Sequence, residues 1–150
     1  MQPKSHSDSN QKPNLSHTRA KGAQSERLAV RHLESLGLRI VQCNVRAKFA
    51  EIDIIAKDGD CLCFIEVRSR GDDRYGVPEA TVGSKKQFRI VKAASLYLQK
   101  LHPNLPMCRF DVLAITGFGD KADIRYFKNA FGADCIGAAP RFRGNPWQVY

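Results

Sequence analysis

Three acidic residues lie in stretches whose pattern otherwise predicts buried, apolar structure. Glu26 precedes Ala29 and Leu33 by three and seven residues, which places it on the apolar face of a helix. Asp53 interrupts one apolar strand-like run, and Glu66 lies near the end of the next. An isolated buried carboxylate destabilises a fold unless it is paired, protonated or bound to a metal. The sequence therefore predicts a shared role for the three acids.

The expected strand geometry brings these acids together with a cation. Side-chain alternation puts Glu51 and Asp53 on one face of their strand. It likewise puts Glu66 and Arg68 on one face of the next strand. A hairpin can join the two faces, and the helix can add Glu26 from above. Because hard cations prefer carboxylate oxygens, we expect Glu26, Asp53 and Glu66 to hold Mg2+ or Mn2+.

Each acid also has a purely structural explanation. Glu26 could form a capping interaction with the loop before its helix, or pair with Arg27 or Arg31 at the surface. Asp53 could be a turn residue at a strand edge, and Glu66 could form an exposed charge pair with Arg68. Taken singly, these alternatives are at least as good as a metal site. Taken together they explain less, because all three acids interrupt otherwise apolar patterns.

The hydrophobic pattern predicts the elements that must position these residues. Gly37 is the expected stop of the first helix, and Asp58-Gly59 between two apolar runs predicts an antiparallel hairpin. Ser84 and Gln87 have the spacing of a capping box. The expected elements are a helix from about 21–25 to 36, strands at 39–44, 50–57 and 61–69, a helix at 84–102, and strands at 109–116 and 123–127. This order, α-β-β-β-α-β-β, predicts an α/β fold around a mixed sheet.

Length and composition set the class of protein. The chain has 150 residues, a formal net charge of +9 and 43% hydrophobic residues. That length suits one domain, and the apolar content excludes a wholly disordered chain. We expect a polar, basic tail over 1–20, a folded domain over 21–131 and a loose tail over 132–150. The positive charge favours an anionic partner, nucleic acid first.

Cysteine usage and hydropathy predict the compartment. Five cysteines form an odd set without C-x-x-C spacing, which disfavours both a disulfide framework and a zinc site. No run approaches the roughly 18 apolar residues of a membrane span. The first 21 residues lack the apolar region of a secretory signal. We therefore expect a cytoplasmic protein without a membrane partner.

Several short motifs between Lys21 and Phe127 form one pattern, in order and without large insertions. They are Gly22-x3-Glu26-x2-Ala29, Asn44-Val45-Arg46, Glu51-Ile52-Asp53-Ile54-Ile55, Phe64-Ile65-Glu66-Val67-Arg68-x-Arg70, Gly76-x-Pro78-x-Ala80, and Arg109-Phe110-Asp111-Val112. This pattern resembles the YraN-type family of uncharacterised, endonuclease-like bacterial proteins. No single short motif carries the match, which makes the resemblance specific.

The resemblance implies a restriction-endonuclease-like fold and membership of the PD-(D/E)xK nuclease superfamily, which includes archaeal Holliday-junction resolvases. In that superfamily a helix Glu, a strand Asp and a following (D/E)-x-K bind divalent metal. The matching positions are Glu26, Asp53, Glu66 and Arg68. The implied activity is phosphodiester hydrolysis in DNA, with branched or damaged DNA as candidate substrates. The analogy with resolvases also suggests a homodimer.

Arg68 departs from the superfamily pattern, which has lysine there. A guanidinium stays charged and cannot act as a base, although it can hold water or stabilise charge on a phosphate. Lys85 or Lys86, at the start of the second helix, could supply an ammonium instead. Two functions remain open: a metal-dependent nuclease, or a catalytically impaired nucleic-acid-binding module on the same fold. A protein-interaction scaffold is a third.

Basic residues near the acids could line a phosphate-binding cleft. The candidates for nucleic-acid binding are Arg46, Lys48, Arg70, Lys85 and Lys86. Taken singly, each is better explained as a solvated surface residue. Together with the net charge, they predict nucleic acid as the partner, and the resemblance implies that this nucleic acid is DNA.

Overall fold

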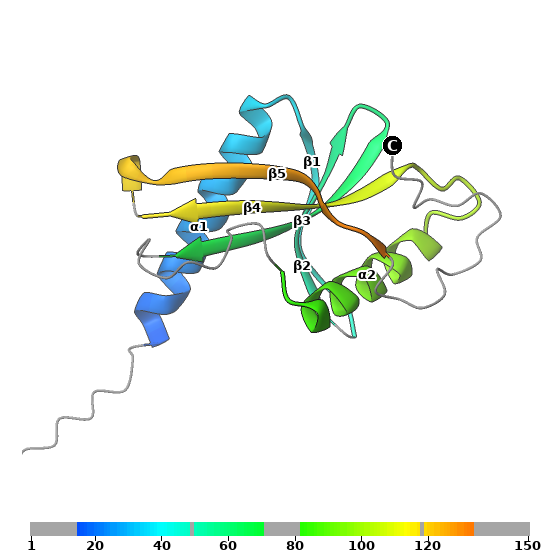
Figure 1. The fold of residues 1–150 in the computed structure, drawn as a ribbon, viewed down its shortest axis with the longest axis horizontal. Coiled ribbons are helices and arrows are strands. Elements are labelled where there is room, and N and C mark those ends of the chain that lie inside the picture. Colours follow the sequence, from blue (N-terminus) through cyan, green and yellow to red (C-terminus); the bar gives the residue numbers. More distant parts are fainter. Residues whose placement is uncertain (1–14, 49, 71–81, 118, 134–150) are drawn as a thin grey trace, which may run out of the picture.

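The computed structural model describes residues 15–48, 50–70, 82–117 and 119–133, which form a five-stranded sheet and two helices (Figure 1). The elements are α1 (Leu15–Ser35), β1 (Arg39–Arg46), β2 (Glu51–Asp58), β3 (Cys61–Arg70), α2 (Ser84–Gln99), β4 (Cys108–Thr116), a short 3-10 helix (Gly119–Lys121) and β5 (Asp123–Phe131). The predicted order of helices and strands is confirmed.

The sheet is mixed, as predicted. Its strands follow chain order, β1-β2-β3-β4-β5. Neighbours are antiparallel except β3 and β4, which run parallel and are connected through α2. A parallel pair needs such a crossover, because a tight turn cannot return the chain to the same end of the sheet. This α/β architecture is consistent with a restriction-endonuclease-like fold.

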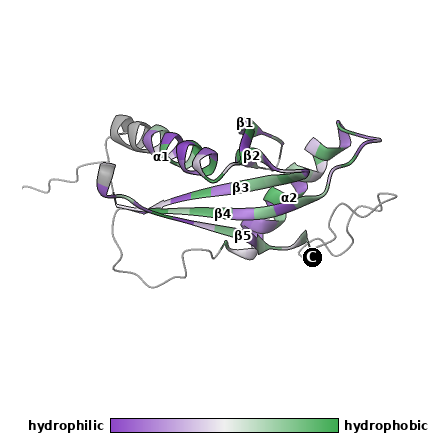
Figure 2. Ribbon diagram, turned by 90° about the horizontal axis from the view of Figure 1, so that it is seen from above, coloured by the Kyte–Doolittle hydropathy of each residue, from purple (hydrophilic) through white to green (hydrophobic). Residues whose placement is uncertain are grey.

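The two helices cover opposite faces of the sheet (Figure 2). On the α1 side, Ala29 and Leu33 pack against strand residues such as Ile54. On the α2 side, Ile90 and other helix residues pack against a second set that includes Phe64. The two apolar clusters stabilise the sheet from both sides and fix which strand residues can face each helix.

The start of α1 was predicted too late, whereas its end was predicted correctly. The helix begins at Leu15, not between residues 21 and 25. Its first turns lack apolar periodicity, which is the signal that the sequence prediction used. At the other end Gly37 has φ 86°, and the Leu38 N–H donates to the carbonyl of Leu33 at 3.0 Å. These features form the expected glycine stop.

The turn between β2 and β3 is the predicted hairpin, but α2 does not begin with a capping box. Gly59 has φ 59°, which suits a tight connection between antiparallel strands. The N-cap of α2 is Gly83, one residue before the predicted Ser84, and no side chain caps it. The Gln87 amide donates instead to the carbonyl of Val82 at 2.6 Å. The spacing of Ser84 and Gln87 was therefore misleading.

The remaining boundaries differ by a few residues. The helix α2 ends at Gln99, three residues before the predicted end, and β5 continues to Phe131. The predicted tails fall largely on residues 1–14 and 134–150, which lie outside the described residues. Within the described part of the chain, no helix has the length and apolar character needed to cross a membrane.

Candidate functional site

The irregular end of the β2–β3 ladder positions Asp53. Paired residues run from the hairpin to Ile54 and Ile65, and the ladder stops there. One oxygen of Asp53, Oδ2, accepts a hydrogen bond from the backbone N–H of Val67 at 2.7 Å. Ile52 and Ile54 pack into the cores on opposite sides of the sheet, although alternate residues of a regular strand share one face. The strand is therefore distorted at Asp53.

Glu66 lies beside Asp53 on the α2 side of the sheet. Only 5% of its surface is exposed, and its Oε1 atom pairs with the ammonium of Lys86 in the first turn of α2. Arg68 follows two residues later on the same face of β3. Glu66, Arg68 and Lys86 line a cavity of about 110 Å³ together with Val82 and Gly83. The carboxylate of Glu66 and the cationic groups of Arg68 and Lys86 thus line one small pocket.

The two carboxyl groups are electrostatically coupled. Burial raises the pKa of Asp53, and the negative charge of Glu66 and a hydrogen bond with it raise the pKa further, to about 7. The Val67 N–H and the charge of Lys86 act in the opposite direction. Two acids this close cannot both ionise without a compensating charge, which a proton or a cation can provide. An interacting carboxyl pair of which one member, Glu66, lines a pocket is typical of a functional site.

Glu26 does not join this pair. Its Oε2 atom accepts a hydrogen bond from the side-chain amide of Asn44 at 3.0 Å. The β1–β2 register places Asn44 opposite Asp53, so Glu26 lies near the same level of the sheet. In the described part of the chain, no three His, Cys, Asp or Glu side chains are grouped closely enough to hold one metal ion. The structure thus brings together two of the three predicted carboxylates.

Asn44 is a contact that sequence reasoning missed. It has φ 53°, a left-handed conformation that few residues other than glycine adopt. Asparagine is among those few, because its short amide can bond locally. An asparagine within a strand pattern was therefore the available signal. Its side chain holds the carboxylate of Glu26, so it controls where that acid points.

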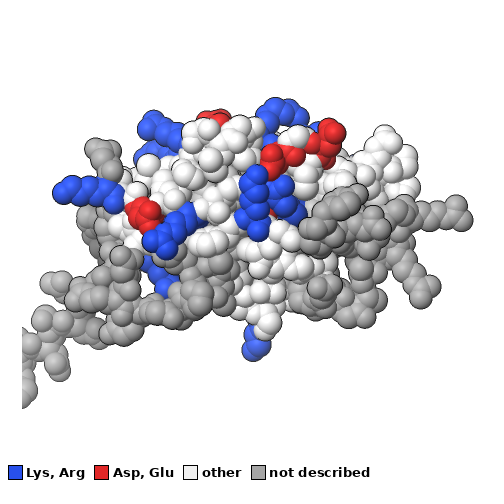
Figure 3. All heavy atoms as spheres, turned by 45° about the horizontal axis from the view of Figure 1, so that its top comes forward, with Lys and Arg blue, Asp and Glu red and all other residues white. Residues whose placement is uncertain are grey.

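The five basic residues predicted to bind nucleic acid lie in different places. Lys86 belongs to the pocket of Glu66, and Lys85 is its exposed neighbour on α2. Arg70 ends β3, two residues beyond Arg68. Arg46 and Lys48 instead line a larger groove against the second half of α2. On the face drawn in Figure 3, basic side chains form separate groups with acidic ones beside them.

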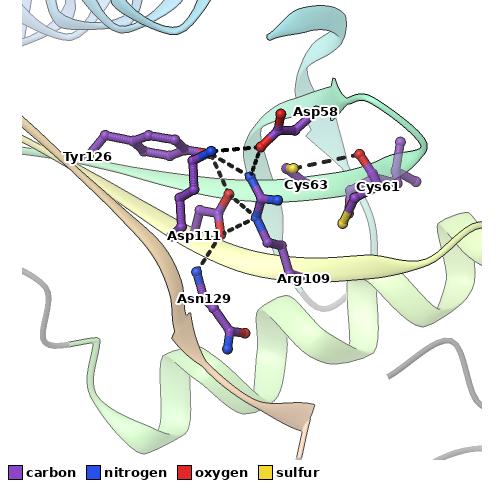
Figure 4. Close-up of polar contacts among 9 residues, drawn as sticks. Asp58, Cys61, Cys63, Arg109, Asp111, Tyr126 and Asn129 are labelled. Atoms are coloured by element: carbon purple, nitrogen blue, oxygen red, sulfur yellow. Dashed lines mark hydrogen bonds and ion pairs between the residues drawn. The ribbon is translucent and has the colours of Figure 1, made fainter. Parts of the chain in front are cut away.

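A second polar cluster on the α1 side of the sheet has a structural role (Figure 4). Asp111 is fully buried and accepts hydrogen bonds from the Arg109 guanidinium, the Tyr126 hydroxyl and the backbone N–H of Asn129. Arg109 also donates to Asp58 at 2.8 Å. The charge of Asp111 is thus compensated, so this cluster stabilises the sheet. The sequence analysis assigned it no role.

The described geometry defines an α/β protein with a coupled carboxyl pair beside two cations. The model of Uncharacterised protein family UPF0102 matches residues 25–115. A UPF0102 protein of Syntrophus aciditrophicus is 44% identical over 110 residues, which cover 73% of this chain and 87% of the relative. One of Chromohalobacter salexigens is 43% identical over 116 residues, covering 77% and 94%. The chain belongs to the UPF0102 family, which confirms the predicted YraN-type membership.

Proposed function

We propose that this chain is a metal-dependent nuclease that hydrolyses phosphodiester bonds in DNA, with Asp53 and Glu66 holding Mg2+ or Mn2+. The observation that carries the proposal is the interacting carboxyl pair of half-buried Asp53 and buried Glu66, next to a pocket lined by Arg68 and Lys86. A pocket of this kind offers oxygen ligands to a hard cation and positive charge to a phosphate.

The donor set fits a divalent cation. Both acids present oxygen atoms, which Mg2+ and Mn2+ prefer over nitrogen and sulfur. One Asp53 oxygen is held by the Val67 N–H, and this bond orients the carboxyl group. Burial raises the pKa of Asp53, and repulsion by the negative charge of Glu66 raises it further. A bound cation would relieve that repulsion.

The residues around the pair have separate roles in this proposal. A divalent cation supplies Lewis acidity toward a phosphoryl oxygen and lowers the pKa of water. Arg68 donates hydrogen bonds to a non-bridging phosphate oxygen, because its guanidinium matches phosphate geometry. Lys86 adds an ammonium to the pocket that Arg68, at the position of the superfamily's motif lysine, also lines. The N-terminus of α2, at Gly83, favours negative charge in the same pocket.

The second candidate is a nucleic-acid-binding module that has lost turnover. Two observations favour it: Arg68 stands where the superfamily has lysine, and Lys86 already pairs with Glu66. In that case the ion pair neutralises Glu66 permanently, and the pocket binds phosphate without cleaving it. This module would bind DNA in a salt-sensitive manner, because its contacts would be mainly to phosphates.

Cleavage assays test the leading proposal. Duplex, single-stranded and four-way-junction DNA are incubated with the protein and Mn2+, and products are resolved on denaturing gels. We expect cleavage of at least one substrate, and its loss in Asp53→Asn. Asp123→Asn is the matched control, because Asp123 is exposed and pairs with Arg125 on the edge strand β5. No cleavage of any substrate, or equal cleavage by Asp53→Asn, would contradict the nuclease proposal.

Arg68→Lys separates the two candidates. Where wild-type protein cleaves DNA and the variant loses activity, Arg68 is an adapted part of a working site. If only Arg68→Lys cleaves DNA, the wild-type protein is a binding module, and the substitution has restored the lysine that catalysis needs. DNA binding by both proteins, measured in a chelator, shows in either case that the pocket still folds.

A further inference from the structure

A larger groove lies apart from the carboxyl pair, between the end of β1 and the second half of α2. Its volume is about 430 Å³, within the range of about 300–1,000 Å³ typical of pockets for small organic groups. We call it the α2 groove; it is lined by Val45, Arg46, Ala47, Lys48, Ala93, Leu96, Tyr97, Gln99 and Lys100. Its apolar side chains come from both elements, so neither forms the groove alone.

The α2 groove combines apolar walls with positive charge. Arg46, Lys48 and Lys100 are cationic, and none of the described residues that line the groove is acidic. Arg46 lies 3.7 Å from Glu51, but its side chain is 85% exposed and can reach further partners. A purely apolar ligand would not need the three cations. An inorganic anion would not need the apolar walls.

Tyr97 gives the groove a fixed aromatic side chain. Its ring packs edge-to-face on the buried Phe64, with 6.0 Å between ring centroids and an interplanar angle of 83°. Tyr97 is partly buried against the core through this contact, and it also lines the groove. A planar ring held in this way is a stacking platform for bases, whose faces are apolar and polarisable.

We propose that the α2 groove binds unpaired bases of a nucleic-acid strand, with Arg46, Lys48 and Lys100 contacting the flanking phosphates. A nucleotide is the ligand class that joins a planar, apolar face to a negative charge, which is the combination the groove offers. Bases in a duplex are stacked on each other and cannot enter, so the proposal predicts a preference for single strands and for DNA with an unpaired segment.

The position of the groove makes a shared strand feasible. Lys86, next to the carboxyl pair, and the groove residue Ala93 lie on α2, and Lys100 is the residue that caps its C-terminal end. At 1.5 Å per residue they are separated by about 10 and 20 Å along the axis. This corresponds to about three to six nucleotides at the 3.4 Å spacing of one strand in a duplex. The proposal rests on the nucleic-acid partner of the proposed function and adds the form of DNA preferred.

Binding measured without catalysis tests the groove. Fluorescence anisotropy with a labelled oligothymidine of about 15 nucleotides is recorded in a chelator, so that no cleavage occurs. We expect Lys100→Glu to weaken binding about tenfold or more. Lys121→Glu is the matched control, because it makes the same charge change at an exposed residue between β4 and β5. It should change affinity by less than about twofold. Equal losses in the two variants would overturn the proposal.

The role of the bases needs a second comparison. An abasic strand of the same length keeps the phosphates, and we expect it to bind about tenfold more weakly to the wild-type protein. Tyr97→Leu should remove most of that difference, and its thermal melting would show that it folds. Equal binding of the abasic strand would overturn the proposal. So would tight binding to anionic lipid vesicles that Lys100→Glu abolishes, since the groove would then serve a membrane surface.

These results are separable from those on the carboxyl pair. Loss of binding in Lys100→Glu, with no cleavage by the wild-type protein, would support the groove and contradict the nuclease. Cleavage that depends on Asp53, with normal binding by Lys100→Glu, would support the nuclease proposal and contradict the proposal for the groove. Asp53→Asn should retain oligonucleotide binding in the chelator, because Asp53 does not line the groove.

Discussion

At the residue scale, the candidate site depends on the environment of Asp53, which burial and the nearby charge of Glu66 determine. Asp53 and Glu66 are close enough for their charges to interact, and the ammonium of Lys86 pairs with Glu66. Burial, together with the charge of Glu66, raises the pKa of Asp53 to about 7, although a carboxyl group in an unfolded chain titrates near 4. This difference between the folded and unfolded states has consequences for stability as well as for cation binding.

Asp53 should make the fold less stable as pH rises from about 4 to about 7. In this window the unfolded chain releases the Asp53 proton while the folded protein keeps it, so the folded state binds more protons and loses stability with rising pH. Asp53→Asn removes this penalty while keeping an oxygen for the Val67 N–H. We expect the variant to gain on the order of 2 kcal/mol at pH 8 in a chelator, and little at pH 4.

Urea unfolding of both proteins at several pH values measures this effect. Asp123→Asn, at an exposed acid, is the control and should follow the wild-type pH profile. Addition of Mn2+ at pH 8 should then stabilise the wild-type protein more than Asp53→Asn, because only the folded carboxyl pair binds the ion. The same pH dependence in wild type and Asp53→Asn would show that the two acids are not coupled in this way.

Lys86 and Lys85 differ in position by one residue and should differ in function. Both are exposed, but Lys86 lines the pocket and contacts Glu66, whereas Lys85 is not among the residues that line that pocket. If the proposed nuclease activity is present, Lys86→Met should lower the cleavage rate on the order of 100-fold, through loss of a charge that stabilises the transition state. Lys85→Met should change it by only about twofold. Single-turnover rates at saturating protein would detect the difference, and similar rates in the two variants would remove Lys86 from the site.

At the scale of elements, the crossover from β3 through α2 to β4 assembles the pocket. Glu66 and Arg68 lie toward the carboxyl end of β3, and α2 begins beside them with Gly83 and Lys86. Ligand sites in sheets with parallel strands form preferentially at this end, because helices then begin next to it. The distortion of β2 at Asp53 adds the second carboxylate from the antiparallel neighbour.

The stop of α1 allows a matched test of backbone conformation. Gly37 has φ 86°, and no atom lies within 4 Å of a Cβ added there, so Gly37→Ala should destabilise the fold through backbone strain alone. We expect a loss of about 1 kcal/mol. Gly22→Ala lies inside the same helix, also with open space, and should stabilise by about 0.5–1 kcal/mol. Urea midpoints that shift in the same direction for both variants would contradict this account.

At the scale of the whole molecule, the sequence predicted the elements well and the assembly of the site only in part. Hydrophobic periodicity and the Asp58-Gly59 turn predicted the strands and their order, because these signals are local. Glu26 accepts a hydrogen bond from Asn44, which lies in another element. Lys86 reaches Glu66 because the crossover from β3 to β4 passes through α2. The Lys86 contact leaves no local pattern, and the only local signal of the Glu26 contact is an asparagine within a strand pattern. The first turns of α1 were missed because their sequence lacks apolar periodicity.

The two polar clusters lie on opposite faces of the sheet. The cluster around Asp111 connects strands, whereas the carboxyl pair belongs to the proposed site. Asp58, Arg109, Asp111 and Tyr126 connect β2, β4 and β5 on the α1 side, while the carboxyl pair lies toward α2 (Figure 4). Lys128 and Arg109 lower the pKa of Asp58, so this acid stays charged. Burial and a hydrogen bond to Asp111 raise the pKa of Tyr126, so its hydroxyl stays protonated and continues to donate.

Asp111→Ala should therefore lower stability without changing the chemistry per folded molecule. The substitution leaves the Tyr126 hydroxyl and the Asn129 N–H without their buried acceptor, and Arg109 keeps only Asp58 as an acid partner in the cluster. We expect a loss of about 3 kcal/mol in the free energy of unfolding, measured in urea. Oligonucleotide affinity at a temperature where the variant is folded should match wild type. A selective loss of binding with unchanged stability would mean that the α1 side contacts nucleic acid after all.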